Sequence, residues 1–418
     1  MKRCINQREC VSCGLSVNGT LRSGPLAALV CALSLSLLGN VVRADRATAI
    51  LADGKTLSGE LVSVDAKAGA TFQTDGGTRD VPLDRLVEWG VPREATGPII
   101  VLLTDGSELS ALQVSLAGDD LVIASPVLGR VRVAVEHVSA ILFDSPTLTT
   151  ERDALIASIR ARSEQNDRVA TRGGDAFSGI LVGISAEAVT IERADASFDV
   201  PLADVGTIAL DPTLGAVPDH AAAGLWCGLA DGSRVLARGM STADGNVRIS
   251  HAGTSTLSVP LDAVVWLQPV RVTGGVTYLS DLEPAEYRNV PLVGSEWPYR
   301  LDAAVTGAPL RAAGRRYAKG VGLHSASRLT YDLAGKYSRF ASLVAIDDHV
   351  PAGQGSVVFR VRTDGNVVYE SLPMRSGDEP QAVDVDVNGA GRLTLEVDYA
   401  DRGHVLDRAD WLGARLVK

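Results

Sequence analysis

The sequence predicts an all-β protein in which four small β-barrel-like repeat units are followed by a β-sandwich. Three observations favour this class. Short apolar stretches alternate with polar residues at a period of two along most of the chain. Glycine accounts for 42 of the 418 residues and separates these stretches at turns. All eight tyrosines follow residue 275, which indicates that a second type of domain begins there.

The first 44 residues are expected to be a signal peptide rather than part of the fold. They contain a basic segment and then an apolar run, Pro25–Leu38, with small residues before Asp45 where a signal peptidase cleaves. The run is short for a bilayer span, although a retained N-terminal anchor stays an alternative. The sequence therefore predicts a protein that is secreted or held in the periplasm or cell envelope.

The net charge and the cysteine content exclude one class of partner and one source of stability. The net charge is −10 and no basic stripe offsets it, so phosphate backbones would be repelled and nucleic acid is not expected as a partner. Apart from Cys227, every cysteine lies before residue 45. Cys227 follows Leu225 and Trp226 in an apolar run, which predicts a buried and inert thiol. With one cysteine left, core burial must stabilise the fold.

An internal repeat of about forty residues occupies the chain up to residue 271. The units begin with an apolar strand and a tight turn. Asp-Gly pairs at Asp53, Asp105 and Asp231 suit a turn that needs positive φ. Each unit closes on another alternating apolar run. We expect units one and two at 45–147 and units three and four at 169–271.

Residues 148–168 are expected to form a helical linker that joins the two pairs of units. Thr150 followed by Asp153 is typical of a capping box. Leu155, Ile156 and Ile159 form an apolar stripe at helical spacing. Little other helical periodicity occurs in the sequence, which keeps the prediction mostly β.

The strand–Asp-Gly–strand start of the units resembles one hairpin of the Sm family, and the unit size suits a small SH3-like or Sm-like barrel. No RNA-binding residue is carried over from this resemblance, because acidic charge and export both oppose RNA binding. The repeats are interpreted either as an array that contacts other envelope proteins or as a scaffold alone.

The last part of the chain contains several motifs in series: Y-L-S-D-L at Tyr278, W-P-Y-R-L-D at Trp297, Y-A-K-G-V-G-L-H-S at Tyr317, A-I-D-D at Ala345 and a final block from Asp401 to Trp411. In this order they resemble the NPCBM family of carbohydrate-binding modules over residues 276–418. The resemblance implies a galactose-binding-like β-sandwich, or jelly roll, with ligand-facing loops at one end. It also implies sugar binding as the activity.

A sugar site needs an aromatic face and a few polar side chains. The candidate ligand-binding residues are Trp297, Tyr299, His324, Asp347, Asp348, His404, Asp407, Asp410 and Trp411. Trp297, beside Pro298 in an expected loop, is the preferred stacking residue, whereas a core position is the commoner environment for a tryptophan placed like Trp411. His324 is interpreted either as a ligand contact or as a histidine that ties two loops together.

The region departs from the family pattern at two positions. Ala345 stands where the family usually has glycine, and Arg408 stands where it usually has histidine in Asp-His-Ala-Asp-Trp. A ligand or metal contact of that histidine is therefore not carried over. The carboxylate-rich stretch Asp401–Asp410 is interpreted as a solvated loop or as the site of a structural calcium ion, which many galactose-binding-like domains hold. No other cofactor is expected.

The sequence thus predicts an exported, non-catalytic protein that binds carbohydrate through its C-terminal sandwich. The first alternative is an envelope protein whose sandwich binds protein or only packs against the repeats. The second is a glycoside hydrolase that uses Asp347 with Asp410. The small units leave no room for a catalytic barrel, and G-x-S-x-G, H-E-x-x-H and P-loop motifs are absent from the sequence.

Overall fold

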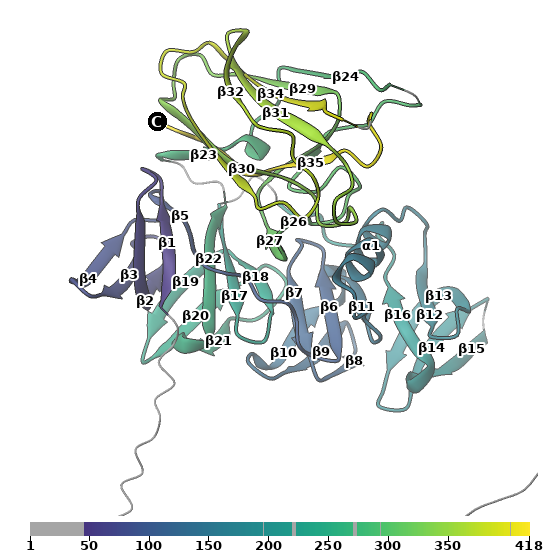
Figure 1. Cartoon of the computed structure of the whole chain (residues 1–418). Helices are drawn as coiled ribbons and strands as arrows, with labels where there is room; N and C mark the ends of the chain where they lie inside the picture. Colours follow the sequence, from purple (N-terminus) through teal and green to yellow (C-terminus); the bar gives the residue numbers. More distant parts are fainter. Residues whose placement is uncertain (1–45, 195, 220–222, 271–273, 293, 402) are drawn as a thin grey trace, which may run out of the picture. The chain divides into compact units, whose positions relative to one another are not determined.

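The computed structural model describes residues 46–418 except 195, 220–222, 271–273, 293 and 402 (Figure 1). The expected signal peptide, residues 1–44, lies outside the described residues. Strands dominate the described part and its one α-helix has 12 residues, so the prediction of an all-β protein is confirmed. None of the helices described here has the length and apolar character that a bilayer crossing requires.

Four successive segments of the described chain each contain five or six strands. The first contains β1 (Ala47–Leu51), β2 (Thr56–Asp65), β3 (Gly69–Thr74), β4 (Gly77–Val81) and β5 (Leu86–Gly90). The second contains β6 (Ile99–Leu103), β7 (Glu108–Ala111), β8 (Gln113–Ala117), β9 (Asp120–Ser125), β10 (Gly129–Ala134), the short 3-10 helix η1 (Val135–His137) and β11 (Val138–Leu142).

The third segment contains β12 (Asp167–Thr171), β13 (Ala176–Ile184), β14 (Ala188–Arg193), β15 (Ala196–Pro201), η2 (Leu202–Asp204) and β16 (Val205–Ala209). The fourth contains β17 (Gly224–Leu229), β18 (Arg234–Ala237), β19 (Gly239–Ala243), β20 (Asn246–Ser250), β21 (Leu257–Pro260), η3 (Leu261–Ala263) and β22 (Val264–Val270). In each segment the last strand pairs with the first, as β5 does with β1. The number of independent repeat units stays a prediction.

Alternation of side chains explains why these residues form strands. β3 buries Ala70 and Phe72, and β20 buries Val247 and Ile249, while the residues between them point away from the core. A period of two places every second side chain on the same face of a strand. The apolar alternation in the sequence therefore becomes one buried face per strand.

The Asp-Gly turns have the geometry that the sequence predicts. At all three pairs the glycine φ lies between +80° and +89°. Each aspartate accepts a hydrogen bond of 2.9–3.0 Å from the backbone N–H two residues later, the donors being Lys55, Ser107 and Ser233. Glycine adopts this left-handed conformation without a steric penalty, and aspartate stabilises the turn through its own backbone.

The segments pair with one another out of sequence order. β5 of the first segment pairs with β22 of the fourth, where Trp89 lies opposite Leu267. β11 of the second pairs with β16 of the third, and β7 meets β18 at Glu108 and Arg234. The predicted boundaries, with units one and two at 45–147 and units three and four at 169–271, stay a prediction. An edge strand offers the same N–H and C=O groups to any neighbour, so strands of different segments can pair out of sequence order.

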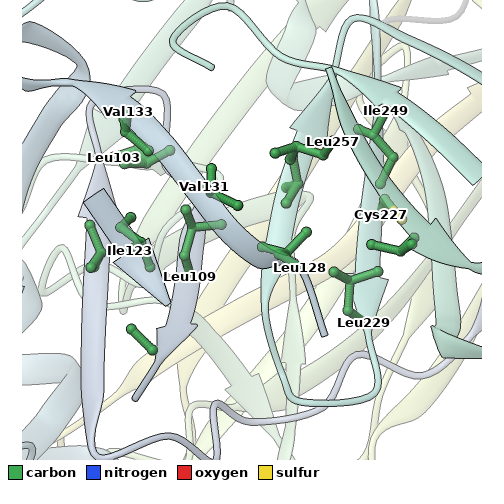
Figure 2. Packing of buried hydrophobic residues seen from close by; sticks show 14 of the residues in the cluster. Leu103, Leu109, Ile123, Leu128, Val131, Val133, Cys227, Leu229, Ile249 and Leu257 are labelled. Atoms are coloured by element: carbon green, nitrogen blue, oxygen red, sulfur yellow. The ribbon is translucent and has the colours of Figure 1, made fainter. Parts of the chain in front are cut away.

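One buried apolar cluster includes residues of all four segments. Figure 2 shows part of it, with Leu109 and Ile123 from the second segment and Cys227 and Leu229 from the fourth. Cys227 is fully buried, and burial raises the pKa of its thiol to about 12. The prediction of an inert thiol is confirmed, because the nucleophilic thiolate does not form near neutral pH.

Helix α1 (Thr149–Arg160) follows the second segment, within the stretch predicted to be helical. The apolar stripe around Ile156 is confirmed, since Ile156 is buried against β6, β11 and β16. The prediction of a capping box formed by Thr150 and Asp153 is wrong. Leu148 occupies the N-cap position without a side-chain hydrogen bond, and Asp153 is fully buried, where it pairs with charged groups of the C-terminal domain. A buried carboxylate requires such partners.

The C-terminal domain is a sandwich of two antiparallel sheets. One sheet has the order β25-β28-β35-β30-β33, with β23 beside β35, and the other has the order β24-β29-β34-β31-β32. The strands of the domain are β23 (Val276–Tyr278), β24 (Glu286–Asn289), β25 (Arg300–Leu301), β26 (Leu310–Ala312), β27 (Arg315–Tyr317), β28 (Gly320–His324), β29 (Ser327–Asp332), β30 (Arg339–Ile346), β31 (Val357–Thr363), β32 (Asn366–Glu370), β33 (Gln381–Asp386), β34 (Arg392–Tyr399) and β35 (Arg408–Val417), with η4 (Leu279–Asp281) after β23. β26 and β27 form a separate hairpin.

Candidate functional site

The structure divides the predicted ligand-binding residues among three places. Trp411 lies in the sandwich core. Three carboxylates lie at or under the β26–β27 hairpin: Asp347, Asp348 and Asp410. The remaining residues gather around the connections beside β28: Trp297, Tyr299, His324, His404 and Asp407.

Trp411 is a core residue. Its side chain is fully buried, and its ring makes an edge contact with Phe359 at 5.3 Å between centroids. The ring is also 6.2 Å from that of Phe340. The alternative that a tryptophan at this position belongs to the core is confirmed, and Trp411 is corrected as a stacking candidate.

The central feature of the third group is a stack of two rings. The indole of Trp297 lies parallel to the imidazole of His324, with centroids 4.7 Å apart and planes at 4°. His404 approaches His324 edge-on at 6.2 Å. His324 is buried, whereas Trp297 and His404 are partly exposed. Two side chains of this cluster are therefore accessible above a buried ring.

His324 is held as a neutral ring. Its Nδ1 lies 2.8 Å from the carbonyl oxygen of Ser325, so Nδ1 carries the proton and donates it to that bond. Burial lowers the pKa of His324, and the nearby charges of His404 and Arg408 lower it further. A neutral imidazole at neutral pH can lie flat against the indole without the cost of a buried charge.

The backbone of Trp297 is fixed by a side chain that sequence reasoning missed. The amide N of Trp297 donates to Oδ1 of the buried Asn289 at 3.0 Å, and its carbonyl accepts from the Tyr287 hydroxyl. Nδ2 of Asn289 donates to Oγ of Ser327 at 3.0 Å. Tyr299 packs edge-on against Tyr287 at 5.0 Å. Nothing in the local sequence marked Asn289, because these partners meet only in the folded sheet.

Asp407 links two connections of the sandwich by hydrogen bonds. Its Oδ1 accepts from the backbone N of Ser356 at 2.8 Å, and its Oδ2 accepts from the Ser325 hydroxyl at 2.7 Å. The carboxyl is buried, and burial raises its pKa. In this structure Asp407 supports the residue next to His324 rather than facing solvent, which corrects its expected direct contact with ligand.

Arg408 adds a charged group to the cluster. It lies opposite His324 in the β28–β35 pair, and directly opposed residues of an antiparallel pair share a face. Its side chain is partly exposed. The arginine that replaces the usual family histidine therefore places a guanidinium beside the ring stack.

Asp347 and Asp410 form a buried acidic pair away from these rings. Asp347 is fully buried, and Asp410 is 1% exposed. Neither carboxyl oxygen of Asp410 has a hydrogen-bond partner in the described part of the chain. Burial, together with the neighbouring Asp347, raises the pKa of Asp410 well above its ordinary value. This shift favours the protonated, neutral form of Asp410 in the folded protein.

The negative charge of Asp347, the other member of this pair, is compensated by His349. Oδ1 of Asp347 accepts from the backbone N of His349 at 2.9 Å and faces its Nδ1 at 2.5 Å. Nε2 of His349 lies 3.3 Å from Oδ2 of Asp153 on α1. Burial acts to lower the pKa of His349, but the two carboxylates outweigh it and raise the pKa to about 9. His349 is then a cation that bridges the domain and α1.

The β26–β27 hairpin covers this region. Arg311 pairs with Asp153 and, at 2.8 Å, with Glu94, while Arg315 pairs with Glu88. These carboxylates belong to α1, to the first segment and to the connection that follows it, so the hairpin joins the sandwich to the repeats. Asp347 and Asp410 are consequently corrected as ligand-facing residues, because the hairpin and its partners bury them.

Asp348 supports the same hairpin. Its carboxylate accepts from the backbone N of Ala313 at 3.1 Å and from that of Gly314 at 2.8 Å, so it caps the turn between β26 and β27. Asp348 is partly exposed. The residue stabilises the hairpin, and its expected role in ligand binding stays a prediction.

The carboxylates considered as calcium ligands are engaged by protein donors. Asp401 pairs with Arg375 at 2.5 Å and accepts from the Ser356 hydroxyl, and Asp407 is bonded as described above. The described residues contain no group of three or more His, Cys, Asp or Glu side chains arranged to hold a metal ion. A structural calcium ion in this stretch stays a prediction.

Comparison with known proteins confirms the family resemblance of the C-terminal domain. The NPCBM/NEW2 domain model matches residues 275–417. A protein of Renibacterium salmoninarum named "Putative endo-alpha-N-acetylgalactosaminidase" is 34% identical over 111 residues, or 27% of this chain, and alpha-1,3-galactosidase B of Akkermansia muciniphila is 34% identical over 117 residues, also 27% of this chain. The chain spans 7% and 14% of the length of these two relatives.

A solved structure also matches part of this chain. It is CBM51 from Clostridium perfringens GH95 in complex with methyl-galactose, with 27% identity and a TM-score of 0.31. The match covers 34% of this chain and 99% of that chain.

Proposed function

Since residues 275–417 form an NPCBM/NEW2 domain, we propose that the protein is an exported, non-catalytic carbohydrate-binding protein whose sandwich binds a glycan at the Trp297–His324–His404 cluster. The observation that carries the proposal is the partly exposed indole of Trp297, which lies flat on the buried ring of His324. A rigid aromatic face of this kind suits the apolar side of a sugar ring. The export proposal depends on the composition of residues 1–44 alone.

The side chains around the indole supply the polar part of the site. Arg408 is partly exposed beside His324 and offers several N–H donors, and His404, which contacts His324 edge-on, is also partly exposed. Sugar hydroxyls accept from and donate to such groups, while the ring face contacts the indole. Asn289 and Asp407 keep these groups in place through the bonds described above.

The buried position of Asp347 and Asp410 bears on the hydrolase alternative. A glycosidase needs two carboxyl groups that flank a substrate in an open cleft. Both carboxyl groups are buried near the β26–β27 hairpin, and the pKa of Asp410 is raised. This arrangement supports a binding role over hydrolysis by that pair.

The proposal is tested with a glycan array on the whole chain, followed by calorimetric titration of the best ligand. We expect Trp297→Ala to weaken binding by about tenfold or more, since loss of the stacking face removes roughly 1.4 kcal/mol or more. Tyr369→Ala, which removes a partly exposed aromatic from β32 on the other sheet, is the matched control and should bind normally. An array without hits, or equal binding by Trp297→Ala, overturns the proposal.

The same samples distinguish the first alternative. An envelope interaction protein would show a protein partner in pull-down experiments and no sugar on the array. The contact of the hairpin with the repeats accounts for one face of the sandwich. If Trp297→Ala abolishes glycan binding, the function belongs to the Trp297–His324–His404 cluster beside β28 and not to the face that the hairpin covers.

A further inference from the structure

A cavity lies between the fourth segment, the end of α1 and the C-terminal domain, apart from the Trp297 cluster. Its volume is about 380 Å³, within the range of small-molecule sites. Two aromatic residues, Trp226 and Tyr317, line it together with Arg160, Arg234 and Arg316. A cavity with aromatic and charged walls is a candidate for binding a small polar ligand.

Three guanidinium groups on one wall share a single carboxylate. Arg316 lies 2.8 Å from Glu108, Arg234 lies 3.4 Å from it, and Arg160 lies 3.5 Å from it. Glu108 is buried, at 8% exposure. One negative charge cannot balance three positive charges, and uncompensated charges away from water are costly. This wall therefore lacks negative charge.

The other carboxylates near this wall already have partners. Asp105 faces His251 at 2.8 Å, and Glu94 pairs with Arg311 at 2.8 Å. On the opposite wall Lys319 lies 2.7 Å from both Asp281 and Asp302. Two further lining residues of opposite charge also have interactions of their own: Asp219 and Arg238. The cavity is thus basic on one side and weakly acidic on the other.

Arg234 shows the imbalance most clearly. It is 9% exposed, and its Cζ lies 4.6 Å from the centre of the Trp226 ring. Its Nε has no hydrogen-bond partner among the described residues. Burial and the charge of Arg316 lower its pKa to about 9. A buried guanidinium with an unused N–H is a group that an anionic ligand would stabilise.

We propose that this cavity binds a saccharide residue that carries one carboxylate, of the uronic acid class. The carboxylate would pair with the guanidinium wall, where arginine binds planar carboxylates in a bidentate manner. The ring would contact the partly exposed Tyr317, and its hydroxyls would donate to Asp281 and Asp302. These two aspartates disfavour ligands with several negative charges, such as phosphate esters.

The test is calorimetric titration of the whole chain with D-glucuronate and D-galacturonate. D-glucose and acetate, at the same ionic strength, test the ring and the carboxylate separately. We expect a uronate to bind about tenfold or more tightly than glucose or acetate. Glucose lacks the carboxylate that forms the charge-assisted hydrogen bond, and acetate lacks the ring that contacts the aromatic residue. Binding should weaken as salt concentration rises.

Variants locate the ligand. Arg160→Gln is the preferred change, because the Arg160 side chain is 36% exposed and its loss leaves Arg234 and Arg316 on Glu108. We expect uronate affinity to fall by about tenfold. Ala318→Asp, which adds a negative charge at a partly exposed lining position without removing an arginine, should lower it as well. Arg193→Gln, an exposed arginine on β14, is the matched control.

Each outcome decides the proposal. Loss of uronate binding in both cavity variants, with melting temperatures like that of the parent protein, supports it. No measurable uronate binding, equal binding of glucose, or unchanged affinity in Ala318→Asp overturns it. Loss of uronate binding in Trp297→Ala alone would place the uronate at the Trp297 cluster, which overturns this proposal and leaves the proposed glycan-binding function standing.

Discussion

The indole of Trp297 and the imidazole of His324 lie parallel, 4.7 Å apart, although the two residues come from different connections of the sandwich. His324 is fixed by β28 and by its bond to Ser325, while Trp297 is fixed by Asn289. The stack is thus rigid on both sides. A pre-ordered aromatic face reduces the entropy that a ligand must lose on binding.

Asn289→Ala is expected to weaken both stability and glycan binding. The change leaves the Trp297 amide without its acceptor and removes the donor to Ser327. Loss of such buried bonds costs about 1–3 kcal/mol of the free energy of unfolding. Urea denaturation measures the stability, and calorimetry on the folded protein measures the affinity. Asn388→Ala, at an exposed turn, is the control, and equal affinity in both variants would contradict a positioning role for Asn289.

Arg311→Met is expected to destabilise the junction between the repeats and the sandwich. Arg311 is 2% exposed and pairs with Asp153 and Glu94, so its removal leaves the buried Asp153 with His349 alone as its close cationic partner. Breaking a buried pair costs about 3–5 kcal/mol. Limited proteolysis should then release the C-terminal domain more readily. Arg392→Met removes an exposed pair with Asp332 and should cost less than about 1 kcal/mol. Equal effects of the two variants would show that the Arg311 pair does not hold the junction.

Stability is expected to fall as pH rises from about 6.5 to about 9 because of His349. Its pKa rises from 6.5 to about 9 in the folded protein, so the folded state binds its proton more tightly than the unfolded chain does. That extra stability is fully present below 6.5 and is lost as pH passes through 9. Urea midpoints across this range measure the slope. His349→Gln should flatten it, and an unchanged slope would contradict the bridge between Asp153 and Asp347.

Asp410→Asn is expected to stabilise the protein at pH 7. The pKa of Asp410 is raised well above 3.8, so above that pH the unfolded chain loses a proton that the folded state keeps, and stability declines. An amide has no proton to lose, and each kcal/mol gained corresponds to roughly 2–4 °C in melting temperature. Melting curves at pH 3 and pH 7 test this, the gain being confined to pH 7. Asp348→Asn, which weakens two turn hydrogen bonds, should instead lower the melting temperature.

Local patterns predicted much of the fold. The alternation in β3 and β20, the Asp-Gly turns and the apolar stripe around Ile156 were visible in the sequence because each depends on neighbours within a few residues. The ordered motifs of the C-terminal region identified its family, which the match at 275–417 confirms. The preference for Trp297 over Trp411 as an exposed ring also came from local context, a loop position beside Pro298.

The tertiary structure decided which of the chemically similar side chains are accessible. Asp347 and Asp410 resemble the other carboxylates in the sequence, but a hairpin with Arg311 and Arg315 covers them and joins the sandwich to α1 and the repeats. Pairing of β5 with β22 brings together residues far apart in the chain. Backbone hydrogen bonds do not depend on side-chain identity, so the sequence near a strand does not show which strand it pairs with. The burial of a side chain depends on which distant segment packs above it, so it too cannot be deduced from nearby residues in the sequence.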